Sequence, residues 1–205
     1  MGIFTGSLSK MKSIKQTIQR LRIKRKINKN LKQNGFDRKD FKKRMIAHRN
    51  RDLNIHEILS REYSPVVTVD VYEYCMRKCN WNVSTLQDGA VKDYLLCNLF
   101  LAEVEYGGFW QFFSDETGDM AAETVDALKK VDEVYSDTLT KAIQLFPGGT
   151  VEKDLGKRIK IMEDFDEKTN TYLAELRRIV SERDHDFSLK LFGYLQEHKN
   201  DFLAF

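Results

Sequence analysis

The sequence contains few of the residues that interrupt helices, bind metals or form cross-links. Only two of its 205 residues are proline, Pro65 and Pro147, so long helices are permitted over most of the chain and each proline marks a break. The three cysteines, Cys75, Cys79 and Cys97, are odd in number and lack the C-x-x-C spacing. Free buried thiols are therefore favoured over a disulfide or a zinc site.

Long apolar runs and clustered histidines are also absent from the sequence. No stretch approaches about 18 consecutive apolar residues, and no apolar segment followed by a small-residue cleavage site occurs near the N-terminus. We therefore expect a cytoplasmic protein, with peripheral attachment to a membrane as the second expectation. The four histidines are scattered, and Asp184-His185-Asp186 lacks the i,i+4 repetition of a helical metal site. We accordingly expect neither a metal ion nor another cofactor.

The net charge of +3 conceals two oppositely charged parts of the chain. Residues 1–50 contain 16 lysines and arginines against two acidic residues, a net charge of +14. Residues 51–205 contain 18 lysines and arginines against 29 acidic residues, a net charge of −11. This asymmetry indicates that the two parts present different surfaces to their partners.

The basic part is expected to contain an amphipathic helix. Apolar residues recur at spacings of three and four between Leu8 and Leu31, and most positions between them are Lys, Arg, Gln or Ser. We expect this helix to bind an anionic partner, either the phosphates of nucleic acid or an anionic membrane surface. Alternatively, the helix docks on the acidic part of the chain or on a second subunit. The side chains expected to bind an anion are Lys15, Arg22, Lys24, Arg25 and Lys26.

The helical pattern continues beyond the basic part and predicts an all-α protein. We expect a basic helical extension over residues 1–64 and a compact, bundle-like multi-helix domain over residues 65–205. The run from Val66 to Tyr72 has a strand-like composition, but it continues to Cys79 without a turn signal, so we predict a helix. The expected helices are Ile55–Tyr63, Val66–Cys79, Asp88–Tyr106, Asp119–Phe146 with a break near Val134, Leu155–Phe165, Thr171–Val180 and Asp186–Asp201.

A pair of glycines follows the most apolar of these segments. The segment that ends at Tyr106 is apolar on most sides, as expected of the central buried helix, and Tyr106 lies on one of its apolar faces. Gly107-Gly108 interrupts it, and four aromatic residues follow. A phosphate-binding loop is disfavoured because a helix rather than a strand precedes the glycines and no lysine follows them. We therefore interpret the glycines as a tight corner between helices. The residues of this structural motif are Gly107, Gly108, Phe109, Gln111, Phe112, Phe113 and Gly118.

Five carboxylates surround this motif and are the candidates for acid–base chemistry. They alternate with polar and aromatic residues rather than sharing one helical face, which favours solvated caps, and Asp119 is suited to cap the next helix. A hydrolase would need Glu105, Asp115 and Asp119 to converge in one pocket. The sequence contains no local Ser–His or Cys–His pairing, so we expect a protein without enzymatic activity. The five carboxylates are Glu103, Glu105, Asp115, Glu116 and Asp119.

The segment from Val104 to Asp119 also resembles a known family. Its sequence, VEYGGFWQFFSDETGD, is similar to the hallmark of the bacterial DMP-nineteen family, which runs roughly V-x-N-G-G-F-x-Q-[FY]-F-x-N-x-x-G-D. Weaker matches such as Phe146-Pro147-Gly148 follow in order, so the resemblance covers the chain from about residue 67 to its end. The resemblance implies an all-helical fold without known catalytic activity that acts through protein contacts. The namesake of the family is a dimeric mimic of DNA that occupies the DNA-binding face of a transcriptional regulator, which implies a homodimer here.

Two features distinguish this chain from the family pattern. The family asparagines are replaced by Glu105 or Tyr106 and by Asp115. Residues 101–205 carry 22 acidic residues against 13 lysines and arginines, so cations are interspersed among the acids and the net charge is −9. The part with a charge of +14 would attract DNA rather than imitate it.

We therefore predict a non-enzymatic helical binding module whose acidic domain engages a basic protein, either a regulator or a toxin-like effector. An acidic surface accelerates the encounter with such a partner and contributes to specificity. The alternative is a tether to nucleic acid or to an anionic membrane through residues 1–50. The carboxylates expected to contact the protein partner are Glu105, Asp115, Glu163, Asp164, Asp166 and Glu167.

Overall fold

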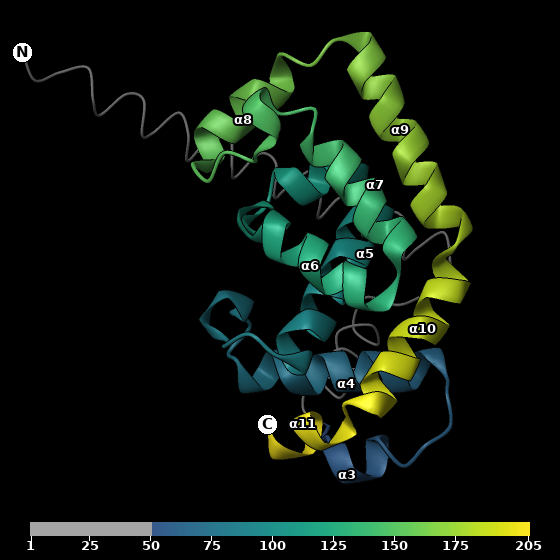
Figure 1. Ribbon diagram of the computed structural model, residues 1–205. Coiled ribbons are helices and arrows are strands. Elements are labelled where there is room, and N and C mark those ends of the chain that lie inside the picture. The colour runs from purple at the N-terminus through teal and green to yellow at the C-terminus, as the bar shows by residue number, and fades with distance from the viewer. Residues whose placement is uncertain (1–50) are drawn as a thin grey trace, which may run out of the picture. The chain divides into compact units, whose positions relative to one another are not determined.

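The computed structural model describes residues 51–205, of which Leu53–Phe205 form one compact unit (Figure 1). Every regular element in this part of the chain is a helix, which confirms the predicted all-α class. No helix in it combines the length and the apolar character required to cross a bilayer. The basic helix expected from Leu8 to Leu31, with its candidate anion-binding residues, lies outside the described residues. The α-helices are α3 (Ile55–Ile58), α4 (Pro65–Lys78), α5 (Ala90–Phe113), α6 (Ala121–Val131), α7 (Glu133–Ile143), α8 (Leu155–Glu163), α9 (Glu167–Glu182), α10 (Asp184–Glu197) and α11 (Lys199–Ala204), and the 3-10 helices are η1 (Val83–Thr85), η2 (Glu116–Met120) and η3 (Pro147–Gly149).

Helix α4 forms from the valine-rich segment whose composition is typical of a strand. Pro65 occupies its first turn, where the missing N–H would have no helical partner, and the Ser64 hydroxyl accepts a hydrogen bond from the Val67 N–H at 3.3 Å. Val67, Val71 and Cys75 are buried and lie four residues apart on one face of the helix. The helical spacing of the buried residues therefore outweighs the β-propensity of the individual valines, as predicted.

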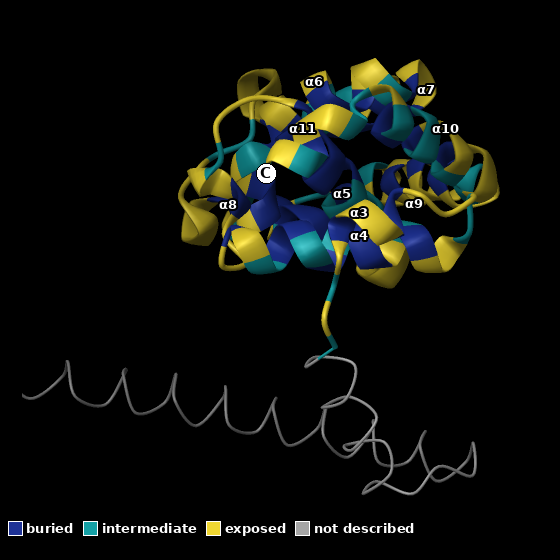
Figure 2. Cartoon of the chain, turned by 90° about the horizontal axis from the view of Figure 1, so that it is seen from below, coloured by how far each residue is buried: buried dark blue, intermediate teal, exposed yellow. Residues whose placement is uncertain are grey.

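Helix α5 is the central element of this unit. All residues from Ala90 to Cys97 are buried, whereas in the following turns burial narrows to a stripe that includes Phe100 and Val104. Helices α4, α6, α9, α10 and α11 pack against it, and Figure 2 shows buried residues gathered on α5 and on the faces of the surrounding helices. The prediction of a central buried helix is confirmed. The placement of Tyr106 on a buried face is wrong, because this residue is 84% exposed.

The two ends of the compact unit meet. Helix α3 packs on both α4 and α11, and Figure 1 shows α3 and α11 close to each other. Ile55 and Ile58 of α3 are buried in the common hydrophobic core. The core thus includes residues that precede Pro65, where the sequence places the domain boundary.

The break between α6 and α7 is centred on a buried aspartate. Asp132 ends α6 and caps α7, because its Oδ1 accepts a hydrogen bond from the Val134 N–H at 2.8 Å. Its Oδ2 lies 2.6 Å from Lys190 Nζ and 3.6 Å from Arg183 Nη2. The predicted break near Val134 is confirmed, and the structure adds an ion-pair network that connects this break to α10.

Replacing Asp132 by asparagine is expected to lower the free energy of unfolding by about 2 kcal/mol at neutral pH, because the amide keeps the cap but loses the charge that Lys190 contacts. Burial alone would raise the pKa of Asp132, but the hydrogen bonds from Lys190 and from the Val134 N–H, with the nearby cations, hold it below its ordinary value. A lowered pKa stabilises the fold above the unfolded-state pKa of about 3.9, and this stabilisation is lost as the pH falls through the folded-state value. Urea denaturation of both proteins over this range should show a difference that narrows on acidification. A difference independent of pH would contradict the assignment.

The remaining helix boundaries differ from the predictions where a cap decides them. Helix α9 begins at Glu167, before the predicted Thr171, because Asp166 Oδ1 accepts a hydrogen bond from the Thr169 N–H at 2.8 Å. The single C-terminal helix expected to reach Asp201 is divided at His198 into α10 and α11. These boundaries depend on local hydrogen bonds that the hydrophobic period does not reveal.

Candidate functional site

The glycine pair forms a kink within α5. Gly108 is buried and adopts φ 74° and ψ −170°, a conformation that is essentially restricted to glycine. The chain then resumes as helix and buries Phe109, Phe112 and Phe113. The Phe109 and Phe112 rings lie 6.0 and 5.4 Å from the ring of Phe100 on the preceding part of the same helix. The kink therefore folds the aromatic residues back onto the central helix, in agreement with the predicted corner.

Because the glycines have no side chains, Gln111 packs closely against Gly107 and Arg177 packs against Gly108. A Cβ atom on Gly107 would lie 2.6 Å from Gln111 Cβ, and one on Gly108 would lie 3.3 Å from Arg177 Cδ. Arg177 Nη2 donates a hydrogen bond of 2.6 Å to the carbonyl oxygen of Glu105, one of the last before the kink. Gln111 Nε2 donates a hydrogen bond of 3.4 Å to Asp115 Oδ2, and Gln111 also lowers the pKa of Glu103.

A buried arginine holds the segment that follows the kinked helix. Arg158 of α8 is fully buried, and its Nε donates to the carbonyl oxygen of Phe113 at 2.6 Å. Its Nη2 donates to the carbonyl oxygen of Asp115 at 2.9 Å, and its Nη1 donates to Asp119 Oδ1 at 2.6 Å and to the carbonyl oxygen of Glu152 at 2.7 Å. One guanidinium group thereby fixes the end of α5, the start of η2 and the approach to α8.

This contact explains two residues of the motif and corrects one prediction. A Cβ atom on Gly118 would lie 3.0 Å from Arg158 Nε, so any other residue there would have to displace the arginine. Asp119 does not cap α6 as expected, because α6 begins after Met120 without a side-chain cap and the Asp119 carboxylate pairs with Arg158. Asp115 is the residue that caps η2, accepting a hydrogen bond from the Glu116 N–H at 2.7 Å.

Sequence reasoning missed Arg158 altogether. Its only signal in the sequence is its position four residues before Met162, on the face of α8 that carries a buried apolar residue. A cation on such a face indicates either a snorkelling side chain or a buried, hydrogen-bonded one. Two of the three backbone carbonyl groups that distinguish the two cases, those of Phe113 and Asp115, come from a segment distant in sequence, so spacing along α8 does not reveal them.

An acidic cleft of about 330 Å³ lies beside this arginine. It opens between the segment Trp81–Ser84 and η2, and α5 contributes Leu99 and Glu103 from adjacent turns. Its apolar lining is Met76, Val83, Leu99 and Met120, and its acidic lining is Glu103, Asp115, Glu116 and Asp119.

The carboxylates of the acidic cleft are not equivalent. Asp119 is paired with Arg158, whereas Glu103, Asp115 and Glu116 form no ion pair with a lysine or arginine of the described part of the chain. Partial burial raises the pKa of Glu103, the hydrogen bond from Gln111 lowers it, and the nearby Asp115 carboxylate raises it further, with a net upward shift. The cleft therefore concentrates negative charge that the described residues leave uncompensated.

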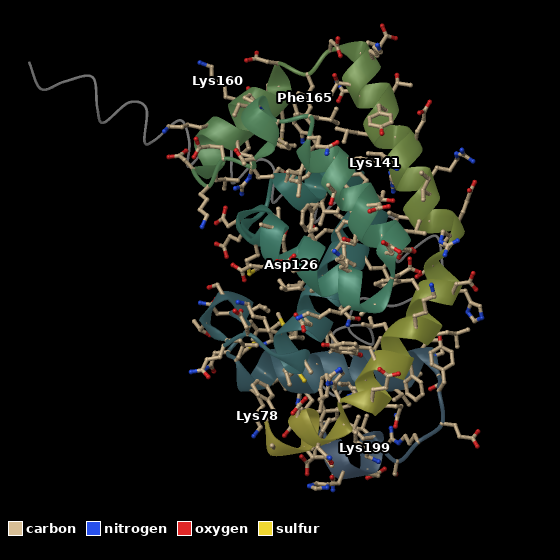
Figure 3. All side chains as sticks on the ribbon, viewed as in Figure 1. Lys78, Asp126, Lys141, Lys160, Phe165 and Lys199 are labelled. Atoms are coloured by element: carbon tan, nitrogen blue, oxygen red, sulfur yellow. The ribbon has the colours of Figure 1, made fainter. Side chains whose placement is uncertain are left out.

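The remaining predicted partner-binding residues lie at two other places. Glu105 is exposed near the kink, where partial burial and the Asp184 carboxylate raise its pKa and Arg177 opposes them. The other four are exposed at the turn between α8 and α9, where Phe165 lies (Figure 3). Phe165 anchors this turn to the core through a ring contact with Phe146 at 5.5 Å. These four are Glu163, Asp164, Asp166 and Glu167.

The chemistry of the site is that of a negatively charged recess. Asp115 and Asp119 line the acidic cleft, but Glu105, the third carboxylate that a hydrolase would require there, does not. Within residues 51–205, no group of three or more His, Cys, Asp and Glu side chains is arranged to hold a metal ion.

The cysteines are buried and free, as expected for Cys75, Cys79 and Cys97. Burial, and to a smaller extent the nearby Cys79 thiol, raises the pKa of Cys75 to about 12.

A comparison with models of known protein families identifies the family of the chain. The model described as DMP19-like protein matches residues 85–198, more than half of the sequence. The chain belongs to this family. No curated protein and no solved structure shows a significant match. In this DMP19-like protein the matched range contains the glycine motif, Arg158 and all four carboxylates of the acidic cleft, whereas Trp81 and Met76 lie before its start.

Proposed function

We propose that this DMP19-like protein is a non-enzymatic binding module whose acidic helical domain engages a basic protein partner, either a regulator or a toxin-like effector. The observation that carries the proposal is the acidic cleft, in which Glu103, Asp115 and Glu116 have no cationic partner among the described residues. Like-charged groups held together in a recess favour the approach of a cationic surface. The net charge of −11 over residues 51–205 adds a longer-range attraction of the same sign.

The composition of the cleft supports binding over catalysis. Asp119 is engaged by Arg158, and neither histidine nor cysteine contributes to the lining. The raised pKa of Cys75 keeps that thiol protonated near neutral pH, and a protonated, buried thiol is a poor nucleophile. A recess of carboxylates and apolar side chains is better suited to recognising a cation than to activating a water molecule.

Association with a basic partner is expected to weaken steeply with ionic strength. Full-length protein and residues 51–205 would be immobilised separately, basic proteins retained from a lysate of the native host would be identified, and the affinity of each would be measured against salt. Screening of exposed charges beyond about 10 Å at 0.1 M salt should reduce the affinity several-fold between low and moderate salt. Absence of any retained basic protein, or an affinity indifferent to salt, would refute the proposal.

Charge-neutral variants provide the control for that measurement. A variant with Glu105→Gln, Asp115→Asn, Glu163→Gln and Glu167→Gln removes four predicted contacts but keeps Asp166, whose cap α9 requires. We expect it to bind at least about fivefold more weakly, since the loss of even one charged contact of about 1 kcal/mol weakens binding by that factor. The Lys141→Gln variant, which removes an exposed cation of α7 (Figure 3), should not weaken binding.

A second candidate function rests on the +14 charge of residues 1–50. In this alternative the basic part tethers the protein to nucleic acid or to an anionic membrane. Deleting residues 1–50 would then abolish binding to duplex DNA or to vesicles that contain phosphatidylserine. A full-length protein that binds neither would eliminate this candidate. Sedimentation of the full-length protein would separately test the homodimer that the family resemblance implies.

A further inference from the structure

We propose that the acidic cleft is the receptor for a single arginine side chain of the partner protein, with its guanidinium group between the carboxylates and against the indole of Trp81. The inference rests on the proposed function and names the chemistry of its contact. The cleft measures about 330 Å³, at the lower end of the usual range for ligand sites, so it suits one long side chain.

Trp81 supplies the aromatic surface for a cation. Its side chain is 57% exposed although it lines the cleft, and its backbone N–H donates a hydrogen bond of 2.7 Å to the carbonyl oxygen of Met76. The backbone that carries the indole is thus held at the end of α4, while the residue remains accessible to solvent. Tryptophan is the aromatic residue with the strongest attraction for cations, and guanidinium groups are its most frequent partners.

The carboxylates supply the charge complement. Glu103 lies on α5 and Asp115 at the start of η2, and the charge of Asp115 contributes to the raised pKa of Glu103, so the two carboxylates repel each other. Gln111 donates a hydrogen bond to Asp115 and partly offsets the rise in the pKa of Glu103. A cation bound between them would relieve this repulsion, and Glu116 would add a third negative charge at the same opening. Charge complementarity therefore identifies the occupant as cationic.

Arginine fits this lining better than lysine does. A guanidinium group is planar, is more weakly hydrated than an ammonium group and donates several hydrogen bonds in a fixed fork, so it can stack on an indole while it contacts two carboxylates. Its aliphatic stem can lie along Met76, Leu99 and Met120, the apolar residues of the same cleft.

The supports of the cleft are rigid, which lowers the entropic cost of binding. Glu103 is carried by the central helix, and two hydrogen bonds of buried Arg158, to the carbonyl oxygen of Asp115 and to the Asp119 carboxylate, fix η2 in place. Asp115 is further oriented by its cap interaction with the Glu116 N–H. A preorganised set of acceptors loses less conformational entropy when the ligand arrives.

The test uses the full-length chain with Trp110→Phe, which leaves Trp81 as the sole tryptophan. Its fluorescence would be titrated with a short Gly-Ser peptide that carries arginines, with the same peptide carrying citrulline, and with a lysine version. We expect the Trp81 signal to respond to the arginine peptide, which should bind at least about tenfold more tightly than the neutral citrulline peptide. Lysine should bind several-fold more weakly than arginine.

Three variants separate the cleft from general surface charge. Glu103→Gln with Asp115→Asn keeps the size of the side chains but removes both charges and one acceptor oxygen from each, and should weaken arginine binding by about tenfold or more. Trp81→Asn, which suits the positive φ of 62° at this position, should weaken it by about fivefold. Asp126→Asn is the matched control, because this exposed carboxylate of α6 (Figure 3) does not line the cleft, and its affinity should stay within about twofold.

Binding to the two cleft variants and to Asp126→Asn would be followed by isothermal titration, with folding checked by thermal melting of each variant. Unchanged arginine binding by both cleft variants, with salt-dependent binding retained, would overturn the cleft assignment and leave the proposed function standing. Equal affinity for the arginine and lysine peptides would overturn the selection of arginine. Absence of binding to every cationic peptide and to every basic protein, even at low salt, would overturn both proposals.

Discussion

Replacing Arg158 by alanine is expected to lower the free energy of unfolding by about 4 kcal/mol, the largest effect of any single substitution considered for this protein. The guanidinium group is fully buried and satisfies three backbone carbonyl groups and the Asp119 carboxylate. Its removal leaves the carbonyl oxygens of Phe113 and Glu152 without this donor and opens a cavity between α8 and η2, although the Asp115 carbonyl oxygen still accepts from the Gly118 N–H. Urea denaturation at neutral pH would measure the difference.

The Arg178→Ala variant is the matched control for this prediction. Arg178 is also on a helix and also pairs with a carboxylate, Glu182, but its side chain is 68% exposed. Exposed ion pairs four residues apart contribute about 0.5 kcal/mol or less, so this variant should unfold close to wild type. Arg158→Lys should fall between the two, because an ammonium group cannot reach four acceptors arranged around a planar fork. If Arg158→Ala cost no more than Arg178→Ala, the role assigned to the buried arginine would be wrong.

The substitution Gly108→Val is expected to destabilise the domain by about 3 kcal/mol. The φ of 74° and ψ of −170° at this position belong to a region that side chains other than glycine essentially do not enter, and a Cβ atom would lie 3.3 Å from Arg177 Cδ. A β-branched residue would have to straighten the kink and displace Phe109, Phe112 and Phe113 from the core. Thermal melting monitored by circular dichroism would detect the loss.

Gly193→Ala is the control for the glycine prediction. Gly193 lies within α10, and no atom is found within 4 Å of the position that its Cβ would occupy. Alanine should therefore stabilise the helix there by up to about 1 kcal/mol. Opposite signs for the two substitutions would show that the backbone conformation of Gly108, and not glycine content in general, decides the effect. Near-wild-type melting of Gly108→Val would contradict the corner assignment.

The helical class and the central helix could be predicted from the sequence, because they depend on the spacing of apolar residues along the chain. Val67, Val71 and Cys75 follow a helical period strongly enough to outweigh their β-propensity. The glycine pair similarly predicts a corner, because only glycine permits the backbone conformation that Gly108 adopts. The same pattern did not reveal that Tyr106 is exposed, since its burial depends on which neighbouring helices cover that side.

The acidic cleft could be predicted only in part. The sequence identifies the carboxylates around the motif, but it assigns Asp119 to a helix cap, which the partner Arg158 on α8 overrides. It also groups Glu105 with Asp115, although Glu105 does not line the cleft, because it lies about 200° around α5 from Glu103, which does. The sequence does not single out Trp81, because its place in the cleft depends on the direction that the chain takes between α4 and α5.

By itself the sequence determined the family, the helical class, the asymmetry of charge and the position of the glycine corner, because each depends on residue types and spacings along the chain. Only the tertiary structure decided which carboxylates share a recess, which cation neutralises one of them, and which aromatic side chain stays exposed beside them. The physical reason is that the strength of a charge contact depends on distance and burial, and both are set by segments that lie far apart in the sequence.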